Sequence, residues 1–335
     1  MVLLSVLDQS PVRSGSTPAE AIQETLRLAE AVDRLGYHRY WLAEHHSSAS
    51  LAGPSPEILI GQVAARTQRL RVGSGGVMLS HYSALKVAEN FRLLEALYPG
   101  RIDLGIGRAP GSDRLTAMAL AHGPGALGLE QFPNRIADLL RFVHDQVEPD
   151  HPFAGVHAMP TGPTAPEIWL LGSSDESAAF AAHFGTAFSF AHFINPRGGA
   201  AVVRAYQRAF RPSAWLAEPR ASIGVFVICA DTEAEALRLA KSRILYIVRL
   251  DSAGARLPYP TVAEAEAHVY TPRELAIAEY NRDRAVAGAP EQVRDRLLAL
   301  AAEYGVDELL ILTITEDYAS RLRSYELLAQ VFGLS

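Results

Sequence analysis

The feature that most constrains the fold is a regular alternation of short apolar runs with helical patterns along the 335-residue chain. The helical patterns carry start and stop signals, such as Thr17 before Pro18 and Gly36 after Leu35. Strands that alternate with helices at a near-constant step of 31 to 35 residues predict parallel strand–helix–strand units. The first expected strands are Leu3–Leu7, Tyr37–Ala43, Leu70–Val77 and Ile102–Ile106, and the helices between them are Pro18–Leu35, Pro54–Thr67 and Ala84–Leu97.

The alternation continues and brings the number of expected strands to eight. Eight strands, each followed by a helix, predict an α/β fold of the (β/α)8 TIM-barrel type, formed as a single domain over residues 1–335. A doubly wound open sheet is the alternative, because periodicity alone does not separate the two. Two irregular segments, about 150–166 after the fourth strand and about 250–285 after the seventh, are expected to be insertions or lids. The further strands are Ile168–Leu171, Ala187–Phe190, Ile223–Cys229 and Glu308–Leu312.

Composition excludes several classes of protein. With 49% hydrophobic residues the chain is not a disordered protein, and its net charge of −6 without a basic run argues against nucleic-acid binding. No stretch approaches the roughly 20 apolar residues of a membrane span, and Met1–Leu7 is too short for a signal peptide. We therefore expect a cytoplasmic protein. The single cysteine, Cys229, excludes an internal disulfide and a multi-cysteine metal site.

The ends of the expected strands carry groups that could bind a phosphate and a flat ring. Barrel enzymes place their sites at the carboxyl ends of the strands. Arg108 follows the fourth strand between glycines, and Gly172-Ser173-Ser174 follows the fifth strand and opens a helix. An arginine beside a helix start is typical of phosphate binding. Gly75 and Gly76, after the third strand, favour the close approach of a flat ligand.

Histidines follow two further strands. Glu44-His45-His46 comes after the second strand and His192-Phe193 after the sixth. A zinc site would need a helical HExxH spacing and a third ligand, so we expect no metal. No GxSxG motif is present, which argues against acyl transfer. A phosphate site, glycines and histidines at one edge together favour a phosphate-bearing cofactor that brings its own reactivity.

At these residues the chain resembles the bacterial luciferase-like flavin monooxygenase family over nearly its whole length. The first 115 residues match most specifically. The motifs that carry the resemblance are Trp41-Leu42-Ala43-Glu44-His45-His46, Leu70-Arg71-Val72-Gly73-Ser74-Gly75-Gly76-Val77, residues 99–111 (PGRIDLGIGRAPG), Leu170-Leu171-Gly172-Ser173-Ser174 and residues 288–293 (GAPEQV).

The resemblance implies a role for each candidate residue. It implies FMN as the cofactor, with Gly75 and Gly76 joined by a cis peptide behind the flavin ring and His45 as a catalytic residue. His192 lies where the luciferase itself has a tryptophan beside the flavin, and we expect it to be catalytic too. The residues that would bind the FMN phosphate are Arg108, Arg135, Gly172, Ser173, Ser174 and Ser177, and those expected in the substrate pocket are Glu44, His46, His81 and Phe193.

The activity that the resemblance implies is monooxygenation of a small organic substrate. Reduced FMN from a separate NAD(P)H:flavin reductase would react with O2 to give a C4a-hydroperoxide, which passes one oxygen atom to the substrate. The alternatives are an oxidoreductase that transfers hydride with the deazaflavin F420 or with FMN, and a flavin-binding protein without turnover. Relatives commonly pair through helices near the second and third strands, so a homodimer is also expected.

Overall fold

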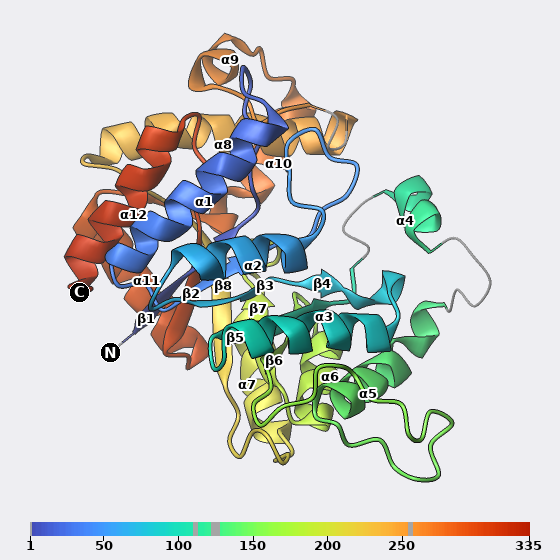
Figure 1. Cartoon of the computed structure of the whole chain (residues 1–335). Coiled ribbons are helices and arrows are strands. Elements are labelled where there is room, and N and C mark those ends of the chain that lie inside the picture. The colour runs from blue at the N-terminus through green and yellow to red at the C-terminus, as the bar shows by residue number, and fades with distance from the viewer. Residues whose placement is uncertain (1, 110–112, 122–127, 254–256) are drawn as a thin grey trace.

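Eight parallel strands close into a barrel in the computed structural model, which describes residues 2–109, 113–121, 128–253 and 257–335 (Figure 1). Strand β10 pairs with both β1 and β8, and these pairings close the sheet. The TIM-barrel prediction is confirmed, and the open sheet is excluded. The barrel strands are β1 (Leu3–Asp8), β2 (Arg39–Leu42), β3 (Arg71–Ser74), β5 (Ile102–Gly107), β6 (Glu167–Gly172), β7 (Ala187–Ala191), β8 (Ala221–Cys229) and β10 (Glu308–Leu312).

Two short strands extend the sheet at the carboxyl end of the barrel. The single strand predicted over Leu70–Val77 is instead β3 followed by β4 (Val77–Met78), because Gly75 and Gly76 interrupt the pairing. Gly75 and Gly76 are joined by a cis peptide bond, as the resemblance predicts. Strand β9 (Ala285–Gly288) pairs in parallel with the last residues of β8 and was not predicted.

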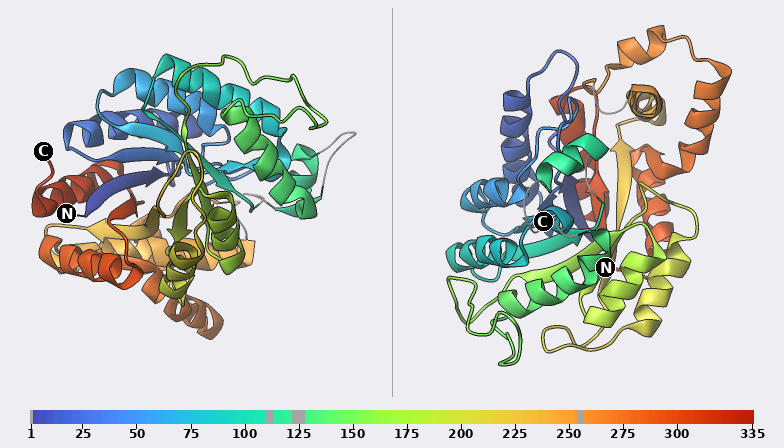
Figure 2. Two further views of the ribbon diagram at one scale, coloured as in Figure 1. Left: turned by 90° about the horizontal axis from the view of Figure 1, so that it is seen from below. Right: turned by 90° about the vertical axis from the view of Figure 1, so that its right-hand side faces the viewer.

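Helices surround the strands on the outside of the barrel (Figure 2). The capping box at Thr17 starts the first helix where the sequence predicts it. Short 3-10 turns, η1 (Leu79–His81), η2 (Leu129–Gln131) and η3 (Arg282–Arg284), join some of the elements. The helices are α1 (Pro18–Arg34), α2 (Pro56–Arg66), α3 (Ala84–Leu97), α4 (Arg114–Leu120), α5 (Phe132–Val143), α6 (Asp175–Phe184), α7 (Gly199–Ala209), α8 (Glu233–Ala253), α9 (Val262–Ala267), α10 (Pro272–Tyr280), α11 (Pro290–Tyr304) and α12 (Tyr318–Phe332).

The two segments expected to be irregular differ from each other. Residues 150–166 form no helix or strand, whereas residues 250–285 contain the end of α8, then α9, α10 and η3. These helices lie together at the top of Figure 1. Capping boxes at Thr261 and Thr271 start α9 and α10, and this signal was present in the sequence. Pro110 and Gly111, which belong to the motif after the fourth strand, lie outside the described residues.

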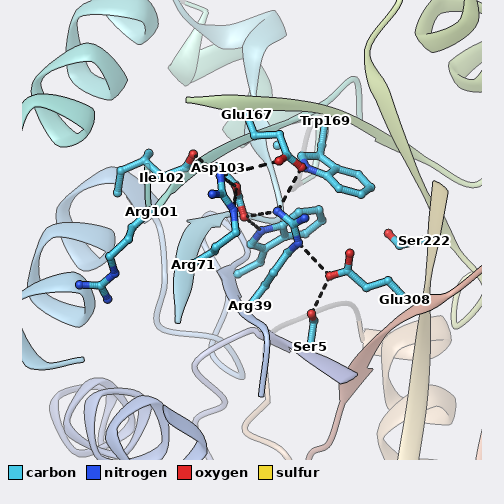
Figure 3. Close-up of polar contacts among 12 residues, drawn as sticks. Ser5, Arg39, Arg71, Arg101, Ile102, Asp103, Glu167, Trp169, Ser222 and Glu308 are labelled. Carbon is cyan, nitrogen blue, oxygen red and sulfur yellow. Dashed lines mark hydrogen bonds and ion pairs between the residues drawn. The ribbon is translucent and has the colours of Figure 1, made fainter. Parts of the chain in front are cut away.

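A network of ion pairs fills the amino-terminal end of the barrel interior (Figure 3). Arg39 is 3% exposed and lies 2.9 Å from Asp103, 2.8 Å from Glu308 and 3.2 Å from Glu167. Arg71 pairs with Asp103 at 2.5 Å. Each of these charges therefore has a partner of opposite sign, and the ion pairs join the strands at this end of the barrel.

Tryptophan side chains form the next layer of the interior, above the ion pairs. The rings of Trp41 and Trp169 pack edge to face with centroids 5.2 Å apart. Their Nε1 atoms donate to Asp103 at 2.9 Å and to Glu167 at 2.7 Å, which ties this layer to the network below. The interior positions beyond the tryptophans are mostly small, and they leave space at the carboxyl ends of the strands. Those small residues are Ala43, Gly75, Gly107, Ala191 and Gly224.

Candidate active site

A cavity of about 340 Å³ opens where the small residues end the barrel core. Apolar side chains from three strands, Leu7, Leu171 and Leu310, form part of its wall. The predicted site residues that the structure brings together around it are Glu44, His45, Gly75, Gly76, Arg108, Gly172, Ser173, Ser174, Ser177 and Phe193.

The Gly75–Gly76 segment lines this cavity and packs closely against its neighbours. A Cβ atom on Gly75 would lie 2.6 Å from Leu7 Cδ1, and one on Gly76 would lie 2.7 Å from the Gly105 carbonyl oxygen. The Gly75 N–H donates to Leu42 O at 2.8 Å, which holds the segment against β2. The backbone is therefore exposed to the cavity as a fixed, flat surface suited to the face of a ring.

The start of α6 forms an anion-binding end of the cavity. Ser174 is the N-cap residue, yet its hydroxyl caps no backbone N–H; it lies 3.4 Å from the Ser177 hydroxyl. A Cβ atom on Gly172 would collide with the Ser177 side chain, so the strand end passes directly over these hydroxyls. Open N–H groups at a helix start and two hydroxyls are the donors that a phosphate accepts from.

Arg108 extends this end of the cavity from β5. Its guanidinium donates to Glu176, in the first turn of α6. Both side chains are partly exposed, 36% for Arg108 and 50% for Glu176, so this ion pair contributes little to stability. An anion bound at the start of α6 would compete with Glu176 for the guanidinium.

His45 contributes an uncharged ring to the cavity wall. Burial, with the neighbouring His46 as a second cause, lowers the pKa of His45 from 6.5 to about 4. Its Nδ1 atom is buried and has no hydrogen-bond partner among the described residues. At neutral pH the ring is therefore a neutral imidazole with an unused nitrogen, which is the state a proton acceptor needs.

Glu44 holds the neighbouring polar groups in place. The carboxylate is buried and accepts from the Met78 N–H at 3.0 Å and from the Tyr82 hydroxyl at 2.8 Å. The same carboxylate lies 2.7 Å from His46 Nε2. Burial and the nearby Glu44 carboxylate raise the pKa of Tyr82, which keeps its hydroxyl protonated as a donor. Glu44 is thus committed to three partners on the cavity wall.

A second, larger chamber of about 1030 Å³ adjoins the first. The two spaces share Gln9, His45, Phe193 and Ile194 as lining residues, and His46 lines the larger one. Gln9 was not predicted as a site residue. It directly follows β1, and this position at the carboxyl end of a strand is the sequence signal that marks it as a candidate. Leu115 and Thr116 bring α4 to the wall of this larger chamber.

The structure places three predicted site residues away from both cavities. His192 is buried with its Nδ1 atom 2.9 Å from the Tyr304 hydroxyl of α11, because the chain turns at the end of β7 and directs Phe193 inward instead. Arg135 donates from α5 to the carbonyl oxygens of Leu79 and Ser80. His81 packs edge to face on His46, with centroids 6.3 Å apart, and lines neither space.

No cluster of three or more histidine, cysteine, aspartate or glutamate side chains is arranged to hold a metal ion within residues 2–109, 113–121, 128–253 and 257–335. Over the same residues, no helix is both long and apolar enough to cross a membrane.

Comparison with known sequences finds relatives that span the whole chain. The model of one protein family, described as luciferase-like monooxygenase, matches residues 2–308. The protein YwcH of Bacillus subtilis (strain 168) is 48% identical over 99% of this chain and 100% of its own length. An N-acetyl-S-alkylcysteine monooxygenase of the same organism is 37% identical over 98% of each chain.

Comparison with solved structures finds the same fold. The structure of apo-MsnO8 has a TM-score of 0.90 and 41% identity, and the match covers 100% of this chain and 99% of that one. A type II Baeyer–Villiger monooxygenase from Pseudomonas putida, solved with FMN, has a TM-score of 0.70 and 19% identity over 98% and 97% of the two chains. An F420-dependent secondary alcohol dehydrogenase has a TM-score of 0.68 and 11% identity over 98% of each chain.

Proposed function

This chain belongs to the luciferase-like monooxygenase family, and we propose that it is an FMN-dependent monooxygenase that adds one oxygen atom from O2 to a small organic substrate. The observation that carries the proposal is the arrangement of the smaller cavity. An anion-binding end at Arg108 and α6, a glycine surface and a neutral His45 line one space that shares a wall with a larger chamber.

The residues of the smaller cavity fit FMN at both of its ends. The phosphate would be held by Ser173, Ser174, Ser177 and Arg108. The start of α6 has backbone N–H donors without partners among the described residues, and the Ser174 hydroxyl caps none of them, so these groups are available to the phosphate. The glycine surface of Gly75 and Gly76 would lie against the ring system. Glu176 would give up its contact with Arg108 as the phosphate arrives, so binding exchanges one anionic partner for another.

The chain's own residues would keep water away from the reaction and transfer a proton. Bound in its reduced form, FMN would supply two electrons to O2 and thereby the activated oxygen that the substrate accepts. The apolar side chains of Leu7, Leu171 and Phe193 keep water from the cavity. His45, neutral at pH 7 and on the cavity wall, would accept a proton on its imidazole ring.

The direct test is equilibrium binding of reduced FMN under anaerobic conditions. Wild-type protein should bind it, and Arg108→Ala should bind it about ten- to a hundredfold more weakly, since a charge-assisted contact to the phosphate is lost. F420 is titrated in parallel. Tighter binding of F420 than of reduced FMN would overturn the monooxygenase assignment and favour hydride transfer. Unchanged affinity in Arg108→Ala would overturn the placement of the phosphate.

Delivery of reduced FMN by a separate NAD(P)H:flavin reductase belongs to the same proposal. Purified protein with FMN, NADPH or NADH and O2 should turn over no substrate until a flavin reductase is added. Oxidation of NAD(P)H by the purified protein alone, at a rate matching product formation, would contradict this two-component arrangement.

The proposal extends to a homodimer of single-domain subunits. Large apolar side chains lie exposed on the helices that follow β2 and β3: Ile58 of α2 is 67% exposed, Leu93 of α3 is 53% exposed and Leu97 of α3 is 60% exposed. An exposed apolar surface of this kind is typical of an interface. Wild-type protein should sediment as a dimer and Leu93→Glu/Leu97→Glu as a monomer. A monomeric wild type would overturn this part.

A further inference from the structure

The larger chamber contains two arginines that the proposed FMN site does not use. Arg243 extends from the middle of α8, and Arg284 ends η3 immediately before β9. The described residues provide neither guanidinium with a hydrogen bond or an ion pair, and the Nε atom of Arg284 is buried without a partner. The Arg243 guanidinium lies over the Phe226 ring, 3.7 Å from its centroid. Both side chains line the chamber, and the described residues offer neither guanidinium a hydrogen-bond acceptor.

Other buried arginines among the described residues each have a carboxylate or carbonyl partner. Arg39 lies among three carboxylates, Arg321 pairs with Asp8 at 2.6 Å, and Arg92 donates to backbone carbonyl oxygens. Each of these three arginines is thus held by an ion pair or by carbonyl acceptors, even though Nη1 of Arg321 has no partner among the described residues. Arg243 and Arg284 depart from that pattern at the same chamber.

An unpaired cation in a partly dry chamber is unfavourable for the protein alone. Burial lowers the pKa of Arg243 to about 10, and the positive charge of Arg284 acts in the same direction. The group nevertheless stays charged at pH 7. Placing a cation without a partner lowers stability unless a ligand provides the partner.

The remaining charge around the chamber does not cancel these two cations. Asp113 is the one carboxylate among the described lining residues, and its Oδ1 accepts from the Thr116 N–H at 2.8 Å as the cap of α4. None of the ion pairs between described residues joins Asp113 to either arginine. His46 is held by Glu44 at 2.7 Å.

We propose that the larger chamber binds the substrate as an organic carboxylate, with the anionic group on Arg243 and Arg284 and an apolar body directed toward Phe193 and His45. The apolar part of the wall comes from Leu51, Ile247 and Leu312, among others. Planar guanidinium groups match the two oxygens of a carboxylate. The identification of this ligand as the substrate rests on the proposed function, because the shared wall would place it beside the flavin.

The test compares two probes of one shape and different charge, without flavin. Calorimetry with 4-phenylbutyrate and with its neutral amide, 4-phenylbutanamide, measures the preference for an anion. Wild-type protein should bind the carboxylate about tenfold or more tightly than the amide. Arg243→Gln and Arg284→Gln should each lose most of that preference. No preference in the wild type, no binding of either probe, or a preference that survives in both variants would overturn the proposal.

Two controls test whether the lost preference for the carboxylate comes from a lost contact with the ligand or from damage to the fold. Arg238→Gln, on the same helix but paired with Glu235 at 2.8 Å and Glu316 at 3.1 Å, should keep the preference. Arg243→Gln should unfold at an equal or higher temperature than the wild type, because it removes an unpaired charge. A large loss of thermal stability would make Arg243 a structural residue and overturn its role.

The same variants distinguish this proposal from the proposed function. Arg243→Gln should bind reduced FMN as the wild type does. A loss of FMN affinity equal to that of Arg108→Ala would assign Arg243 to the cofactor phosphate and overturn its role toward a substrate. If the wild type prefers the carboxylate but binds no reduced FMN, the anion site stands and the monooxygenase assignment fails.

Discussion

The two ends of the barrel interior differ in whether their charged side chains have partners of opposite charge. At the amino-terminal end, three guanidinium groups face three carboxylates, and every one of them has a partner. Figure 3 shows two of these guanidinium groups, Arg39 and Arg71, with the carboxylates. At the carboxyl end, Arg108 has one exposed partner, Arg243 and Arg284 have none among the described residues, and His45 is neutral. The groups at the amino-terminal end are Arg39, Arg71, Arg220, Asp103, Glu167 and Glu308.

The difference shows which charged groups stabilise the fold and which are available for a ligand. The matched network joins five barrel strands through ion pairs, so its charges stabilise the barrel itself. At the opposite end the same chain leaves donors without partners among the described residues, at a cost in stability, and we propose that bound anions supply the partners. The comparison predicts that substitutions at the amino-terminal end change stability and that substitutions at the carboxyl end change binding.

The largest effect is expected from breaking the matched network. Arg39→Met should lower the free energy of unfolding by about 3–5 kcal/mol, because Asp103 and Glu308 would stay buried without their shared cation. Urea denaturation measures this. The control is Arg220→Met, whose guanidinium is 46% exposed beside Glu167 and should cost about 1 kcal/mol or less. Equal losses in the two variants would remove the distinction between buried and exposed partners.

The next effect concerns the neutral histidine at the carboxyl end. The pKa of His45 is lowered to about 4 in the folded protein, so its uncharged form supports folding above about pH 6.5, and this support is lost as the pH falls toward 4. Between pH 7 and pH 5 the wild type should lose about 2 kcal/mol more stability than His45→Gln. Urea denaturation at the two pH values measures the difference.

His144→Gln is the matched control for this prediction. Burial also lowers the pKa of His144 to about 4, and His144 lines neither cavity. Its replacement should change the acid sensitivity in the same direction, while only His45→Gln should slow substrate oxygenation at pH 7. Equal oxygenation rates in His45→Gln and the wild type would contradict the role of His45 as proton acceptor.

The smallest effect is expected from removing the carboxylate that pairs with Arg108. Glu176→Gln should bind reduced FMN about three- to fivefold more tightly, because the phosphate no longer displaces a carboxylate from the guanidinium. Asp175→Asn is the control on the same helix turn; its carboxylate accepts from the Glu176 N–H rather than from Arg108, so its effect should be smaller. Weaker binding in Glu176→Gln would show that Glu176 supports the phosphate site.

Much of the barrel could be predicted because the strand–helix units are local. Ala84–Leu97 was predicted with the bounds that the structure shows, and Glu308–Leu312 likewise. Strand β9 was missed because its four residues have no local pattern of their own and gain their pairing only from β8. The division of Leu70–Val77 into β3 and β4 depends on Gly75 and Gly76, which the sequence marks as special without showing that pairing stops there.

Site residues could be predicted where they directly follow a strand. They could not be predicted where their direction depends on contacts with distant parts of the chain. Arg108 and Ser174 follow strands and line the cavity, whereas the direction of His192 depends on a turn and on Tyr304, 112 residues away. Arg243 and Arg284 were missed for a different reason. Nothing in a sequence indicates that an arginine lacks a partner, because partners come from distant elements.

The measurement that tests the central claim most directly is the reoxidation of reduced FMN bound to the protein. Anaerobic protein with reduced FMN is mixed rapidly with oxygenated buffer, and the absorbance of oxidised FMN is followed together with free peroxide. We predict that oxidised FMN returns more slowly than from free reduced FMN, and that peroxide, one per flavin in the absence of substrate, is released only at that slow rate, because the apolar cavity excludes water. Return of oxidised FMN and release of peroxide at the rates of free reduced FMN would contradict this prediction.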